Sequence, residues 1–112
     1  MDDQDHDAVL DAFHEAVNMT PAELDKWLAT GESRSVGWTH EGDKEAVGHA
    51  SGRRIVAIKR TRKADLTDDD YAEMRRVVGY VHRHMAQRPA GDVRDTRWRF
   101  SLMNWGHDPL KG

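Results

Sequence analysis

Apolar residues recur at the spacing of a helix face in several stretches of this 112-residue chain. Val9, Phe13 and Val17 lie four residues apart, which predicts an amphipathic helix over residues 5–18. A longer stretch, residues 67–87, places its apolar residues at alternating intervals of three and four. This second pattern predicts the central helix of the fold, with one face buried against its neighbours.

Capping residues indicate where helices begin. Thr20 and Glu23 have the spacing of a capping box, and Pro21 suits the first helical position, so a helix is predicted over residues 21–29. Thr67 stands directly before three aspartates, which favours this residue as the N-cap of the central helix.

Two further segments have helical character. Residues 50–63 combine apolar positions, including Ile55 and Ile58, with a high density of basic residues. Residues 96–105 carry tryptophan and leucine at helical spacing and are followed by Gly106, a residue typical of a helix end. Both segments are predicted to form helices, the second a short one.

The predicted fold class is all-α, a compact bundle of about four to five helices. Residues 31–48 hold four of the nine glycines and are predicted to form a loop. The length suits one core, and four tryptophans supplement an apolar content of 38%. We therefore expect one helical domain over residues 1–112, with residues 1–4 and 108–112 frayed.

Composition narrows the functional classes. The chain has no cysteine, which fits a reducing compartment. Its acidic N-terminus is unlike a signal peptide, and no apolar run has membrane-spanning length, so a cytoplasmic protein without a membrane partner is predicted. The phosphate-loop and nucleophile-elbow motifs are absent, and His82 and His84 point apart on a helix. These observations predict no enzyme activity, no metal site and no cofactor.

Charge is distributed unevenly along the chain. Residues 1–32 hold nine acidic residues and one basic residue, whereas residues 33–64 hold eight basic and three acidic ones. Six of those bases fall within residues 53–63. The net charge of −3 therefore conceals a basic helix, whose positive potential suits the phosphates of nucleic acid.

The basic helix follows a glycine-containing segment, residues 48–52, which is predicted to form a turn with free backbone amides. Amides at a helix N-terminus bind phosphate readily, and Ser51 is the predicted N-cap. The helix over 67–87 is acidic at its start and apolar along its length, which leaves the basic helix as the contact element. The candidate nucleic-acid-binding residues are Gly48, Ser51, Gly52, Arg53, Arg54, Lys59, Arg60, Arg62 and Lys63, with Arg34, Arg97 and Arg99 as possible extensions.

Two other interpretations of the basic helix remain open at this stage. Its charges can be solvated, or can pair with the acidic first helix of the same chain. Alternatively, the acidic helix of one copy can meet the basic helix of another. In that case the protein is an interaction or self-association module without a role in nucleic-acid binding, and its tryptophans anchor the interface.

Several motifs resemble those of one protein family. The runs MTPAELDKWLAT, VGHASGRRIVAI and SLMNWGHDP, in this order, are similar to the small proteins of domain-of-unknown-function family 3140. The resemblance extends from about Phe13 to Pro109. It implies that residues 31–52 are an ordered part of the domain. Family members are often labelled DNA-binding, which favours DNA as the partner, and no catalytic residue follows from the resemblance.

Overall fold

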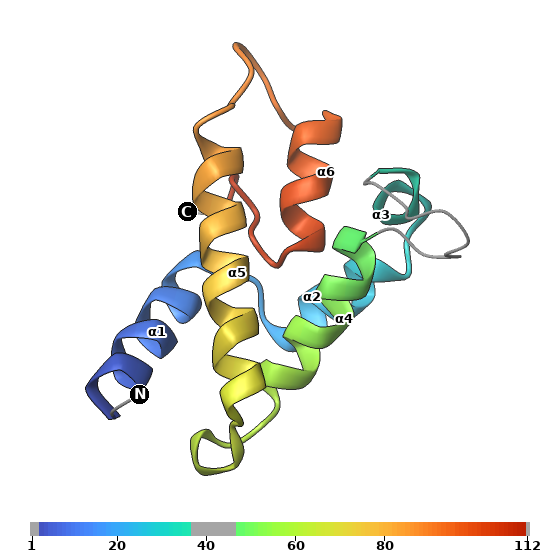
Figure 1. Ribbon diagram of the computed structural model, residues 1–112. Helices are drawn as coiled ribbons and strands as arrows, with labels where there is room; N and C mark the ends of the chain where they lie inside the picture. The colour runs from blue at the N-terminus through green and yellow to red at the C-terminus, as the bar shows by residue number, and fades with distance from the viewer. Residues whose placement is uncertain (1–2, 37–46, 112) are drawn as a thin grey trace.

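The computed structural model describes residues 3–36 and 47–111, and its regular secondary structure there is entirely helical (Figure 1). The predicted all-α bundle is confirmed. Within the described residues there are six α-helices and one 3-10 turn. Their bounds are α1 Asp3–Ala16, α2 Pro21–Leu28, α3 Gly31–Ser35, α4 Val47–Lys59, the 3-10 turn Lys63–Asp65, α5 Asp68–Met85 and α6 Arg97–Asn104.

Threonine caps begin α2, α5 and α6, close to where the sequence predicts. The side chain of Thr20 accepts a hydrogen bond from the Glu23 amide, which completes the capping box of α2. Thr67 caps α5 in the same way, and Thr96 caps α6. Each cap provides an acceptor for an amide that has no partner within its helix.

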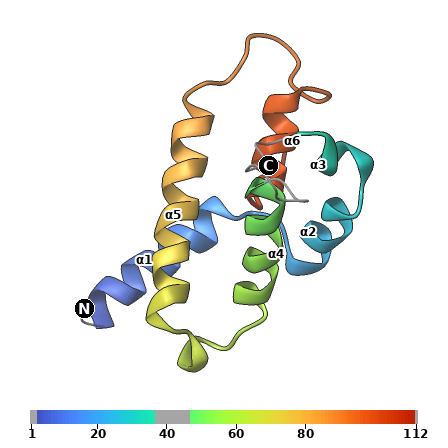
Figure 2. The same cartoon turned by 45° about the vertical axis from the view of Figure 1, so that its right-hand side comes forward.

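The core lies where five helices meet. α1 packs along α5, α2 packs against α4, and α6 contacts both pairs, an arrangement visible in two views (Figures 1 and 2). Each of the five helices contributes one large side chain without solvent exposure, and each such side chain stabilises the fold by about 1.5–3 kcal/mol relative to exposure. These side chains are Phe13, Leu24, Ile55, Met74 and Leu102.

The bounds of two segments differ from the prediction. α4 begins at Val47 and ends at Lys59, so it starts three residues earlier than predicted and stops four residues earlier. Ser51 is therefore an interior helical residue, and its prediction as the N-cap is wrong. The predicted loop over 31–48 contains helix α3, capped by Thr30, whereas residues 37–46 lie outside the described residues.

His107 and Asp108, near the C-terminus, make specific contacts with the rest of the fold. His107 Nδ1 lies 2.7 Å from the carbonyl oxygen of Ala16. The Asp108 carboxylate pairs with Arg99 at 3.1 Å, and this guanidinium helps to lower the pKa of Asp108 although partial burial opposes the effect. Gly106, at φ +81°, makes the turn that returns the chain toward α1.

None of the helices in the described ranges combines the length and the apolar character needed to cross a membrane. Over the same residues, no group of three or more histidine, aspartate and glutamate side chains is placed to hold a metal ion.

Candidate nucleic-acid interface

The glycine segment at residues 48–52 does not form an exposed turn. It makes the first turns of α4 and is buried against α6. A Cβ atom on Gly48 would lie 2.9 Å from Trp105 Nε1, and one on Gly52 would lie 2.4 Å from the Asn104 carbonyl oxygen. The prediction of a phosphate-binding turn is therefore wrong, because these glycines allow α4 to approach α6 closely.

Ser51, which was predicted to contact phosphate, is also committed to the fold. Its side chain is 5% exposed, and its hydroxyl accepts a 2.6 Å hydrogen bond from Arg76 on α5. The serine thus links α4 to α5 and does not present its hydroxyl to solvent.

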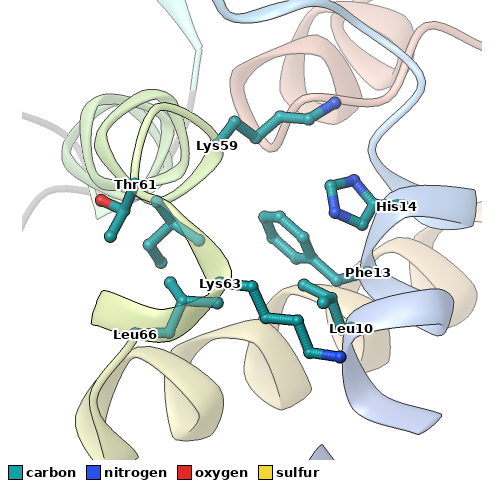
Figure 3. Close-up of a pocket in the computed structure, with 8 residues that line it drawn as sticks. Leu10, Phe13, His14, Lys59, Thr61, Lys63 and Leu66 are labelled. Carbon is teal, nitrogen blue, oxygen red and sulfur yellow. The ribbon is translucent and has the colours of Figure 1, made fainter. Parts of the chain in front are cut away.

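The two lysines at the end of α4 and in the 3-10 turn face α1. Lys59 Nζ donates to the carbonyl oxygens of Val17 and Met19, each at 3.0 Å, and partial burial lowers the pKa of this lysine. Lys63 Nζ lies 2.6 Å from Asp7 on α1. Both lysines line a small pocket of about 60 Å³, where Lys63 extends toward α1 and Lys59 toward the segment that follows α1 (Figure 3).

Three of the predicted arginines have carboxylates nearby. Arg54 lies 3.7 Å from Asp70 and 3.8 Å from Glu73, both on α5.

The other two pairs are Arg60 with Asp25 at 3.9 Å and Arg62 with Asp65 at 3.1 Å. Such exposed pairs contribute about 0–1 kcal/mol each, but they place negative charge beside the positive charge. Pairing within the chain, one of the open interpretations, thus describes much of this region, and the Lys63–Asp7 pair joins it to α1.

A second basic surface lies on the outward face of α5, and sequence reasoning missed it. On a helix, the nearest neighbours of a residue are three and four positions away. For Gly79 these neighbours are Arg75, Arg76, His82 and Arg83, and all four are exposed. We call this set, with Gly79 at its centre, the α5 basic face.

Two arginines of the α5 basic face, Arg76 and Arg83, have fewer carboxylates beside them than Arg54 of α4 has. Arg76 lies 3.6 Å from Glu73 and stacks over Trp105, with its guanidinium carbon 5.1 Å from the ring centre. Arg83 has no carboxylate within 4 Å in the part of the chain that the structure describes. Apart from Glu73, which is 8% exposed, the acidic residues of α5 lie in its first turn.

Additional arginines lie after the end of α5. Arg88 lies over the ring of Trp98 on α6 at 5.5 Å. Arg94 and Arg97 are exposed and form no ion pair within residues 3–36 and 47–111. Arg99 is only partly exposed and pairs with Asp108.

Stacked rings hold α5 in one orientation against α6. The ring of Tyr80 lies 4.1 Å from that of Trp105 and 5.3 Å from that of His84, which in turn lies 6.0 Å from Trp98. Burial raises the pKa of Tyr80 and lowers the pKa of His84. Because these rings face inward, the opposite side of α5, centred on Gly79, faces solvent.

A family model described as a protein of unknown function (DUF3140) matches residues 12–103. The chain belongs to this family. The DUF3140 match includes α4, α5 and almost all of α6, and therefore both basic regions. No curated protein and no solved structure matches the chain.

The motifs by which the chain resembles the DUF3140 family serve the fold. Gly48 and Gly52 contact α6, and Asn104 Oδ1 accepts a hydrogen bond from Ser33 in the interior. Trp27 Nε1 donates to the same oxygen atom at 2.8 Å. The motif residues thus connect α2, α3, α4 and α6, and they do not identify the surface that meets a partner.

One signal in the sequence could have located the second surface. Residues 75–107 contain seven arginines and no lysine, with two aspartates. On the polar face of the helix that these residues predict, Arg75, Arg76 and Arg83 lie together around Gly79. The description of this helix as acidic at its start and apolar along its length omits these exposed basic residues.

Proposed function

We propose that this protein is a small cytoplasmic DNA-binding protein that contacts the phosphate backbone mainly through the α5 basic face. The observation that supports the proposal is the set of neighbours around Gly79, which comprises three arginines and one histidine, all exposed. Arg54, Arg60 and Arg62 have a secondary role in this proposal, because a carboxylate stands beside each of them.

The chemistry of arginine favours phosphate as the partner. A guanidinium is always charged and binds phosphate oxygens through two parallel hydrogen bonds. Each phosphate that it neutralises releases a condensed counterion, so affinity for DNA falls as salt rises. Carboxylates close to a guanidinium compete with phosphate for the same donors, which is why α4 is expected to contribute less.

The first test is a fluorescence-polarisation titration of a labelled duplex of about 20 base pairs with the full chain, at two salt concentrations. We expect binding at low salt and a marked loss of affinity at the higher concentration. Absence of binding at low salt, or an affinity independent of salt, would overturn the proposal.

A pair of matched variants assigns the surface. Arg75→Gln with Arg83→Gln removes two exposed charges from α5, and Arg60→Gln with Arg62→Gln removes two from the segment that follows α4. We expect the α5 variant to lose about tenfold or more in affinity, because each lost phosphate contact costs about 1 kcal/mol or more. The second variant carries the same change in net charge and serves as the control, with a smaller loss.

A further inference from the structure

Gly79 is an unusual residue for its position. It lies near the middle of the 18-residue helix α5, where glycine is the poorest helix former other than proline. Its backbone has no positive φ angle, so the helix does not require glycine there. Gly79 therefore weakens the longest of the described helices without a conformational reason.

Packing within the fold does not explain this glycine either. A Cβ atom on Gly79 would meet only the Arg83 side chain, with its nearest atom, Nη1, at 3.0 Å. This atom is the end of a flexible exposed side chain and can move away. By contrast, a Cβ on Gly52 would meet backbone at 2.4 Å, so the glycine of α4 is required by its neighbours and the glycine of α5 is not.

The position of Gly79 within the basic face indicates what the glycine accommodates. Arg75 and Arg76 lie one turn before it, and Arg83 lies one turn after it. The seven residue-to-residue steps from Arg76 to Arg83 span about 10 Å along the helix axis, which is close to the width of about 12 Å of a DNA major groove. A helix position without a side chain, between two positively charged groups, suits a partner that has a line of negative charge on each side of a groove.

We propose that Gly79 is the point of closest approach between the protein and duplex DNA. In this arrangement α5 lies across the major groove, with Arg75 and Arg76 at the phosphates of one strand and Arg83 at those of the other. The absence of a side chain at Gly79 lets the helix backbone approach the duplex, as glycine does where chains must come close. α5 stands along one edge of the molecule (Figure 2), where a long partner can reach it. The inference rests on the proposed function and deepens it by naming the residue that sets the contact distance.

The inference predicts opposite effects of one substitution on stability and on binding. Gly79→Ala places a better helix former in α5, so the melting temperature rises. The added methyl group holds the duplex away, so affinity falls. Gly79→Gln adds a longer neutral side chain at the same place, and we expect it to weaken binding at least about tenfold, the equivalent of about 1.4 kcal/mol.

The matched control is Ala57→Gln, which adds the same side chain at an exposed position of α4. All four proteins, wild type included, are titrated into the labelled duplex at low salt, and circular dichroism verifies their helix content and melting temperature. We expect Ala57→Gln to bind as the wild type does. If Gly79→Gln folds and binds equally well, the inference is wrong while the proposed function stands.

Two other results also have clear meanings. Equal losses in Gly79→Gln and Ala57→Gln would overturn the inference, because the effect would not depend on the α5 face. No binding by the wild type would overturn both the inference and the proposed function. If Gly79→Gln fails to fold, Gly79→Ala decides alone, since it is expected to be more stable than the wild type and yet to bind less tightly.

Discussion

Helices α4 and α5 present their positive charges in different surroundings. The basic residues from α4 to the 3-10 turn meet Asp7, Asp25, Asp65 and Asp70 at distances of 2.6–3.9 Å. In the α5 basic face, Arg76 lies 3.6 Å from Glu73, and Arg83 has no carboxylate within 4 Å among the described residues. Four of the six basic residues in the sequence run over 53–63 therefore have a carboxylate beside them in the fold.

The comparison shows that charge along a sequence and charge on a surface are different quantities. A run of basic residues gives a positive electrostatic potential at the surface only where the fold places no carboxylates beside it. The acidic first turn of α5, close to Arg54, and the acidic α1, close to Lys63, remove much of the potential of the α4 region. The remaining predictions test the two helices separately, from the largest expected effect to the smallest.

The largest effect is expected from Gly52→Ala in α4. The new Cβ would lie 2.4 Å from the Asn104 carbonyl oxygen and 2.7 Å from Leu28 Cδ2, so α4 must move away from α6 and α2. Overpacking of this kind costs about 1–3 kcal/mol or more. Urea unfolding measures the loss, and Gly79→Ala serves as the control with the opposite sign. A Gly52→Ala protein as stable as the wild type would contradict the packing described for α4.

A second prediction concerns Lys59, which contributes to stability and not to DNA binding. Lys59→Met removes the donor to the carbonyl oxygens of Val17 and Met19, and an unsatisfied partly buried acceptor costs about 1–3 kcal/mol. We expect a lower free energy of unfolding with little change in affinity for duplex DNA. A variant of unchanged stability that binds DNA much more weakly would place Lys59 at the interface and favour α4.

The sequence predicts the local features of this fold better than it predicts contacts between distant residues. The helices over 5–18, 21–29 and 67–87 could be predicted because their apolar spacing and threonine caps act locally. The turn over 48–52 could not be assessed correctly, since the glycines respond to Trp105 and Asn104, more than fifty residues away. The carboxylates beside Arg54 and Arg60 could not be predicted for the same reason, because they come from other helices.

Glu73 offers a way to change the balance between the two helices. Its largely buried carboxylate lies 3.8 Å from Arg54 on α4 and 3.6 Å from Arg76 on α5. Glu73→Gln removes one negative charge beside both arginines and costs about 1 kcal/mol of stability through two half-exposed pairs. We expect tighter binding to duplex DNA in the polarisation assay. Weaker binding by a folded Glu73→Gln protein would argue that the carboxylate positions Arg76 and does not compete with phosphate.

The smallest effect is a dependence of stability on pH. Burial lowers the pKa of His84 below its usual 6.5, so the folded chain binds this proton less readily than the unfolded chain. The contribution of His84 to the free energy of unfolding is then fully present above pH 6.5 and is lost as the pH falls toward the folded-state pKa. Urea unfolding at pH 7.5 and 5.5 measures the decline. We expect His84→Phe, which keeps an aromatic ring in the stack, to reduce this loss of stability at low pH. The remaining loss comes from His14, because burial lowers its pKa as well.

The most direct test of the comparison is a titration of the isotope-labelled protein with an unlabelled duplex, followed by NMR amide signals at low salt. The account predicts that the largest changes occur at residues 75–83 of α5, with Gly79 among them, and continue to Arg88. Smaller changes are expected at residues 59–63. If the largest changes instead fall on residues 59–63 while the amides of 75–83 stay in place, the α5 basic face is not the contact surface.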